Sequence, residues 1–221
     1  MKNSAWKLRR LTILGMLVSL AYLSVFITRI PIVPGAGFLT YEPKDALITI
    51  GAFLLDPLAG VVMTVAVAFL EFISFSDTGA IGLAMNIFSS CLFVCTASLI
   101  YRRKRTLPGA IVGLLCAVVL ATAGMVLWNY LLTPLYMKVP RDLVVTMIPT
   151  IFLPFNLIKS ALNATITMLL YKSVASALRS AKLLPPATVQ KKANSYIPVI
   201  VLSAFILIGI SLALFAWNGI I

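Results

Sequence analysis

The amino-acid sequence predicts an all-α integral membrane protein, and three features indicate this class. Of its 221 residues, 61% are hydrophobic and only 11% are charged, a composition far from that of soluble globular domains. Apolar segments, most of them near the ~20 residues that cross a bilayer as a helix, recur along the whole chain. Lysines and arginines gather in short runs between these segments, as in the cytoplasmic loops of membrane proteins. We therefore expect no soluble domain and no nucleic-acid binding, although the net charge is +12.

Seven apolar segments are expected to form helices in the membrane. The first, residues 11–27, follows a short basic stretch and has no A-x-A cleavage site after it, which predicts a retained helix and not a signal peptide. The second, residues 46–55, is short for a full span, which favours a tilted or partly re-entrant segment. The remaining segments are residues 58–75, 80–101, 108–130, 147–172 and 197–217.

The positions of the basic residues predict the orientation of the chain. The densest run, Arg102-Arg103-Lys104-Arg105, is expected in the cytoplasm. This places the N-terminus in the cytoplasm, and most of the 18 lysines and arginines then fall on the cytoplasmic side. A basic, proline-containing stretch precedes the last apolar segment. We therefore divide the chain into a six-helix membrane domain, residues 1–183, and a linker with a seventh transmembrane helix, residues 184–221.

The segment 147–172 carries polar residues that a membrane helix rarely tolerates. Asn156, Lys159 and Asn163 fall within about 60° of one another on one helix face. A lysine at the bilayer centre costs roughly 2.5–3.5 kcal/mol on insertion scales, so it must face protein, water or a ligand. Pro154 permits a kink or local opening just before this face. We interpret the face as a ligand site; the alternative is that two amides and a snorkelling lysine join neighbouring helices.

Other membrane segments place polar residues toward the same side. With a cytoplasmic N-terminus, Glu71, Asn86 and Asn129 lie near the outer ends of their helices. For Glu71, contact with a ligand and simple extension to the membrane interface are both open. The gathering of these side chains suits the capture of a polar solute from outside the cell.

The residue types present exclude several kinds of chemistry. The chain has no histidine and few carboxylates, which leaves little equipment for an enzyme. It has no P-loop sequence, so active uptake would need separate ATPases. Cys91, Cys95 and Cys116 lie within apolar segments and are expected to be small buried hydrophobic residues, with no disulfide or metal site. We expect no cofactor.

Three short motifs resemble those of a known family. LWNYLLTPLY (residues 127–136), LPFNLIK (153–159) and DPLAG (56–60) resemble sequences of the substrate-binding S component of energy-coupling factor (ECF) vitamin transporters, closest to the riboflavin-specific type. The resemblance implies a six-helix core with the seventh helix added to it. It also implies that the ligand is a vitamin, riboflavin or a related flavin. The residues implied to contact it are Asn156, Lys159, Asn129 and Asn86, with Glu71 one turn beyond the usual polar positions of the third helix.

The resemblance also implies partners. An S component works in the plasma membrane with a transmembrane coupling subunit and two cytosolic ATPases. Gly15 and Ser19 form a small-xxx-small pair on the first helix, which permits close helix approach, and we expect the coupling subunit to dock there. The alternative function is an ion- or proton-coupled secondary transporter in which Lys159 and Glu71 are the coupling groups.

Overall fold

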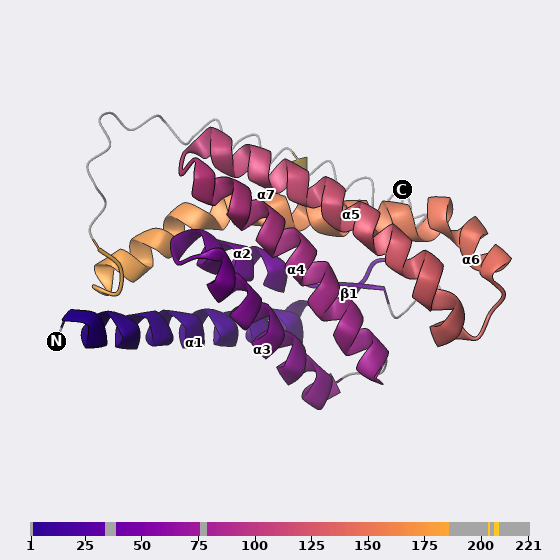
Figure 1. Cartoon of the computed structure of the whole chain (residues 1–221), viewed down its shortest axis with the longest axis horizontal. Coiled ribbons are helices and arrows are strands. Elements are labelled where there is room, and N and C mark those ends of the chain that lie inside the picture. The colour runs from indigo at the N-terminus through magenta and orange to yellow at the C-terminus, as the bar shows by residue number, and fades with distance from the viewer. Residues whose placement is uncertain (1, 34–38, 76–78, 186–202, 204–205, 208–221) are drawn as a thin grey trace.

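The computed structural model describes residues 2–33, 39–75, 79–185, 203 and 206–207, and these are almost entirely helical. The helices form an elongated bundle in which α1 lies along one edge and α7 runs through its length (Figure 1). In chain order the elements are α1 (Lys2–Thr28), β1 (Ile30–Pro31), β2 (Thr40–Tyr41), α2 (Lys44–Leu54), α3 (Pro57–Phe75), α4 (Gly79–Arg103), α5 (Leu107–Met137), α6 (Arg141–Met147), the π-helical segment η1 (Ile148–Phe152) and α7 (Leu153–Ser180).

The predicted all-α membrane fold is confirmed. Among the described residues, five helical segments are long and apolar enough to cross a membrane; the last of them, Arg141–Ser180, combines α6, η1 and α7. The short second helix is also present, because α2 has only 11 residues. The predicted seventh helix, residues 197–217, lies outside the described residues except for Ser203, Ile206 and Leu207.

The fifth helix is longer than the sequence predicts. The sequence predicts a helix over residues 108–130, but α5 continues to Met137 with Pro134 inside it. A proline removes only one backbone donor, and the neighbouring Leu131 and Leu135 stay exposed on the helix surface. The helix ends where Lys138 adopts a left-handed conformation, with φ of 54°.

Two local irregularities surround the segment that carries the polar face. The backbone widens into the π-helical turn η1 at Ile148–Phe152, which contains Pro149 and ends before Pro154, so the predicted opening begins one turn earlier than expected. The connection between the first and second predicted helices contains an antiparallel hairpin, with Ile30 opposite Tyr41. The hairpin packs on this helix through an apolar cluster that contains Ile32, Val33, Leu39, Tyr41, Val144, Phe152, Phe155 and Leu162.

The main core lies toward the other end of the bundle and joins α1, α2, α3, α4, α5 and α7. The DPLAG turn (residues 56–60) joins α2 to α3 beside this core. Its Asp56 accepts a hydrogen bond from the Ala59 backbone N–H (2.8 Å) and forms an ion pair with Arg10 of α1 (2.7 Å). The three cysteines are half-buried and form no disulfide.

Glycines allow α4 and α5 to pack closely. A Cβ atom added at Gly113 would lie 2.7 Å from the backbone carbonyl oxygen of Ala97, which cannot move without shifting α4. A Cβ atom added at Gly15 would meet no atom within 4 Å.

These two glycines provide a matched test of the packing. Gly113→Ala should destabilise the protein by about 1–3 kcal/mol through overpacking. Gly15→Ala should leave the stability of the isolated protein unchanged or raise it by up to ~1 kcal/mol, because alanine favours a helix. Thermal unfolding of both variants in detergent measures the difference, and equal midpoints would contradict the close α4–α5 contact.

Candidate functional site

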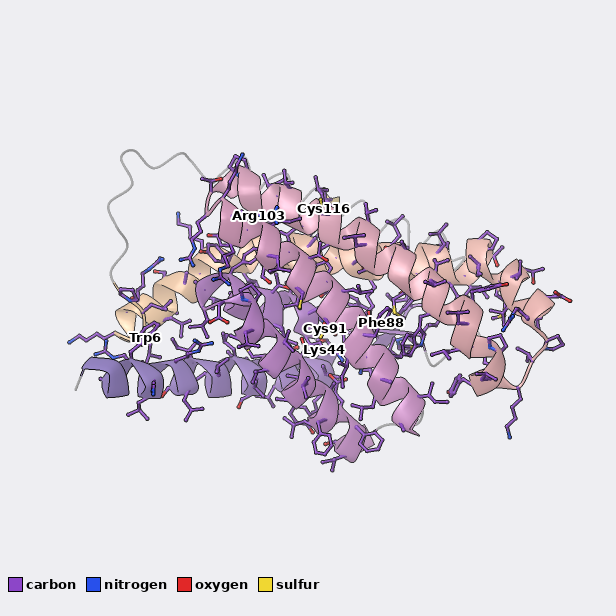
Figure 2. The ribbon with its side chains drawn as sticks, in the orientation of Figure 1. Trp6, Lys44, Phe88, Cys91, Arg103 and Cys116 are labelled. Atoms are coloured by element: carbon purple, nitrogen blue, oxygen red, sulfur yellow. The ribbon has the colours of Figure 1, made fainter. Side chains whose placement is uncertain are left out.

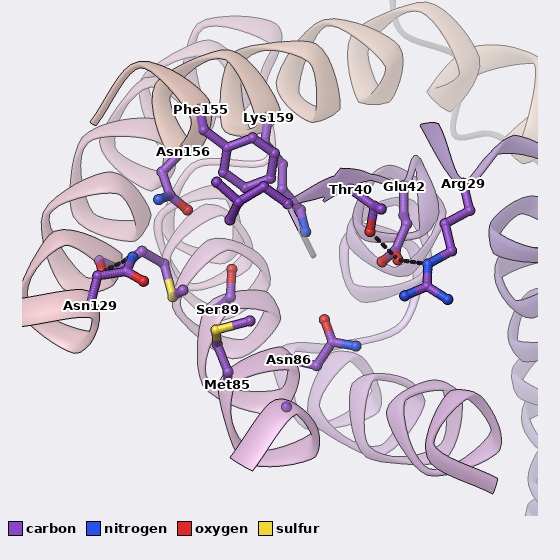
Figure 3. A pocket seen from close by; sticks show the side chains of 13 residues that line it. Arg29, Thr40, Glu42, Met85, Asn86, Ser89, Asn129, Phe155, Asn156 and Lys159 are labelled. Carbon is purple, nitrogen blue, oxygen red and sulfur yellow. Dashed lines mark hydrogen bonds and ion pairs between the residues drawn. The ribbon is translucent and has the colours of Figure 1, made fainter. Parts of the chain in front are cut away.

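The described residues enclose a pocket beside the hairpin, between the ends of α4, α5 and α7 (Figure 3). It holds about 630 Å³ of empty space when its open mouth is included. Polar and apolar side chains share its wall. The lining residues are Arg29, Leu39, Thr40, Glu42, Gly82, Met85, Asn86, Ser89, Met125, Asn129, Phe155, Asn156 and Lys159.

The wall formed by α7 carries an amide, an ammonium group and an aromatic ring. Asn156 is buried and donates a hydrogen bond from Nδ2 to the Phe152 carbonyl oxygen (2.7 Å), which leaves Oδ1 turned toward the hollow (Figure 3). Lys159, one turn further on, is half-buried, and its Nζ lies 6.0 Å from the centre of the Phe155 ring. The π-helical turn before Leu153 sets the direction of this first turn of α7.

The opposite wall contributes two further amides. Asn129 of α5 donates from Nδ2 to the Met125 carbonyl oxygen (2.7 Å) and accepts from the Thr133 hydroxyl (2.9 Å). Asn86 of α4 donates from Nδ2 to Glu71 Oε2 (2.5 Å). Each amide is thus held in a defined orientation by a neighbour.

The hairpin side of the pocket is charged. Glu42 is buried and accepts a hydrogen bond from the Thr40 hydroxyl (3.2 Å), and Arg29 Nε lies 3.8 Å from Glu42 Oε1. Burial raises the pKa of the Glu42 carboxyl group, but the ammonium groups of Lys44 and Lys159 lower it more strongly, and the net pKa falls to about 2. Glu42 therefore faces the pocket as an anion at neutral pH.

Behind this wall lies a buried ion pair. Lys44, at the start of α2, is only 1% exposed and lies inside the bundle, unlike Trp6 and Arg103 at its periphery (Figure 2). Its Nζ lies 2.6 Å from Glu71 Oε1 and 3.0 Å from Glu42 Oε2. Two carboxylates compensate much of the cost of burying this ammonium group.

The structure brings four of the six predicted ligand residues together at the pocket: Asn86, Asn129, Asn156 and Lys159. Glu71 is not among the lining residues and lies behind Asn86. Asn163 is 1% exposed and does not line the pocket either; its Oδ1 has no hydrogen bond to any residue that the structure describes. Its place on the same helix face did not bring it to the pocket, because the pocket ends about one turn before it.

Sequence reasoning missed three charged residues of this region: Arg29, Glu42 and Lys44. The stretch YEPKDA has the composition of a polar loop, yet its Glu42 and Lys44 are buried in the bundle. A usable signal was present, because Lys44 begins a segment too short to span the membrane.

The proposed docking residues of α1 lie on an open surface. Gly15 and Ser19 are both exposed, and the opposite face of the helix is buried in the core through Ile13, Leu17 and Ala21. Among the described residues, the face of α1 that carries Gly15 and Ser19 is therefore uncovered and open to a partner.

The pocket has the chemistry of a binding site. Its amide oxygens and carboxylate accept hydrogen bonds, its lysine and arginine donate them, and Leu39, Met85, Met125 and Phe155 offer apolar surface. No group of His, Cys, Asp or Glu that could hold a metal ion occurs among the residues that the structure describes.

Comparison with known proteins gives one consistent result. A family described as "ECF transporter, substrate-specific component" matches residues 9–171. The riboflavin transporter RibU of Staphylococcus aureus (strain TCH60) is 30% identical over 179 residues, which cover 77% of this chain and 93% of RibU. A solved structure, described as the S component of a bacterial ECF transporter, has a TM-score of 0.66 and 30% identity and covers 78% of this chain and 99% of that one. The chain therefore belongs to the substrate-specific components of ECF transporters.

Proposed function

We propose that this S component binds riboflavin or a related flavin in the pocket between α4, α5, α7 and the hairpin. The observation that carries the proposal is the convergence of Asn86, Asn129, Asn156 and Lys159 on one pocket that also has apolar side chains in its walls. A flavin has a flat apolar ring edged with carbonyl and N–H groups and a polyol chain. Amides and an ammonium group can pair with these polar groups, while Met and Phe side chains pack on the ring. The similarity to RibU supports the same ligand.

We also propose an orientation in the membrane and a set of partners. The basic ends of α1, α4 and α7 lie in the cytoplasm, so the pocket, next to Arg29 beyond the end of α1, opens to the outside. A transmembrane coupling subunit docks on the exposed face of α1 around Gly15 and Ser19, and two cytosolic ATPases supply the energy. Residues 1–183 form the binding unit, and residues 184–221 form a linker and an added helix.

The family match argues against the secondary-transporter alternative, and one of its two coupling groups, Glu71, is poorly placed for that role. A coupling group must be able to load and release an ion as the site turns over. Glu71 is instead held by Lys44 and Asn86, away from the pocket.

Riboflavin binding and its dependence on Lys159 test the proposed function. The purified protein should carry the yellow absorption of a bound flavin, and Lys159→Ala should weaken riboflavin binding at least about tenfold, or ~1.4 kcal/mol. Fluorescence quenching of riboflavin by the detergent-purified protein measures the affinity. Lys104→Ala, at an exposed position of the cytoplasmic basic run, is the matched control. Absence of flavin binding by the wild-type protein would refute the proposal, and an unchanged affinity of Lys159→Ala would reduce that lysine to a structural role.

The docking surface has a separate test. Replacing Gly15 and Ser19 by leucine should abolish riboflavin uptake in cells while the isolated variant still binds riboflavin, because bulk there blocks close helix approach and leaves the pocket untouched. Uptake and affinity are measured on the same variant. Weakened binding by the isolated variant would show that this face packs within the S component.

The division of the chain can be tested by truncation. A chain that ends after Leu184 retains every residue of the pocket and the last described contacts of α7 with the core. Its riboflavin affinity in detergent should stay within about threefold of the full chain, a difference below 1 kcal/mol. A loss beyond tenfold in a folded truncation would place residues 185–221 within the binding unit.

A further inference from the structure

We infer that Glu71 is a positioning residue that fixes the Asn86 amide so that its oxygen, and not its nitrogen, faces the ligand. The inference rests on the proposed function of the pocket. It assigns to Glu71 a role in ligand selectivity without contact with the ligand, and it includes Lys44 as the residue that holds Glu71 in place.

The hydrogen bonds around Glu71 allow only one orientation of Asn86. A carboxylate accepts hydrogen bonds and cannot donate them. Asn86 must therefore turn Nδ2 toward Glu71, and the 2.5 Å separation of Nδ2 and Oε2 agrees with this arrangement. The other atom of the amide, Oδ1, then points into the hollow, as Figure 3 shows. Among the described residues, no protein donor reaches this oxygen.

Lys44 keeps Glu71 an acceptor. An ammonium group has three donors and no acceptor, and it lies within hydrogen-bond distance of both Glu71 oxygens. A proton on either oxygen would compete with the hydrogens of the ammonium group. Glu71 therefore has no O–H group with which it could turn the Asn86 amide around. Because Lys44 is only 1% exposed, water cannot readily take over its role.

The side-chain amide of Asn156, on the facing wall, is oriented in the same way, with its oxygen toward the hollow. Its Nδ2 is occupied by the Phe152 carbonyl oxygen, so its Oδ1 is the atom presented to the hollow. Together Asn86 and Asn156 form a pair of acceptors, while Lys159 supplies donors beside them. The ligand group that sits between the two amides is thus a hydrogen-bond donor, either an N–H at the edge of a flat ring or the hydroxyl groups of a polyol chain.

An exchange of partners tests the inference. In Glu71→Gln, Lys44 holds the carbonyl oxygen of the new amide, and the amide nitrogen faces Asn86. Asn86 then accepts with Oδ1 and turns its nitrogen to the ligand. Riboflavin binding should fall at least about tenfold. Adding Asn86→Asp should restore it to within about threefold of the wild type, because the carboxylate introduced on α4 accepts from the amide introduced on α3 with one oxygen and presents the other to the ligand.

The double variant keeps the net charge and nearly the shape of the pair, so the rescue cannot come from bulk or overall charge. Asp142→Asn, an exposed carboxyl-to-amide change at the start of α6, is the matched control and should not alter binding. Thermal midpoints of the ligand-free proteins provide a readout that does not need riboflavin. The double variant should unfold at a higher temperature than Asn86→Asp, in which two carboxyl groups meet.

Each outcome decides a separate point. Full binding by Glu71→Gln, or no rescue by the double variant, overturns the positioning role. Additive thermal effects of the two substitutions overturn the pair itself, and this holds even if the wild-type protein binds no riboflavin and the proposed function fails. If Asn86→Asp does not fold, the riboflavin affinities of Glu71→Gln and of the double variant still give the comparison.

Lumiflavin, a flavin ring without the ribityl chain, identifies the donor group of the ligand. If Glu71→Gln also weakens the binding of lumiflavin, the donor is the ring N–H. If Glu71→Gln leaves lumiflavin binding unchanged, the donors are the hydroxyl groups of the ribityl chain.

Discussion

The pocket end of the bundle depends on one buried ammonium group. Lys44 stands at the start of α2 and holds Glu71 of α3 and Glu42 of the hairpin. Burying an ion costs several kcal/mol even after relaxation, and that cost is compensated only while both carboxylates stay in place. The ion pair therefore fixes the depth of the short helix α2 and the position of the hairpin relative to α3. The charged hairpin side of the pocket and, through Glu71, the Asn86 amide depend on this arrangement.

Non-helical backbone at membrane depth occurs where it can be covered by protein. A lipid-exposed loop would leave backbone N–H and C=O groups without partners, which the hydrocarbon layer does not tolerate. Here the hairpin pairs its own backbone and packs on Val144, Phe152 and Leu162. The π-helical turn Ile148–Phe152 lies at the same level of the bundle, because its Phe152 packs in the same cluster. The irregular segments thus meet where the pocket needs side chains from several directions.

The general fold could be predicted from the sequence because it depends on apolar segment length and on basic runs, which are local properties. The polar face of α7 was also visible, since Asn156 and Lys159 stand out in a membrane helix. The positioning role proposed for Glu71 could not be predicted from the sequence. It depends on Lys44, which is 27 residues away and lies in a stretch with the composition of a loop. That Asn163 does not line the pocket could not be predicted either, because helix periodicity gives the face of a residue but not the point at which the pocket ends.

Fixed acceptors explain how such a pocket can select its ligand. A buried polar atom without a partner costs roughly 1–3 kcal/mol, and the amide oxygens of Asn86 and Asn156 are held so that the protein does not satisfy them. A ligand with donors at both places pairs them, whereas a flat molecule of similar size without donors leaves both unpaired once water is excluded. Sites of this kind reject analogues far more strongly than an apolar pocket can. An apolar wall alone would admit many ring compounds, so the discrimination resides in the orientation of the amides and, through Asn86, in the buried ion pair behind them.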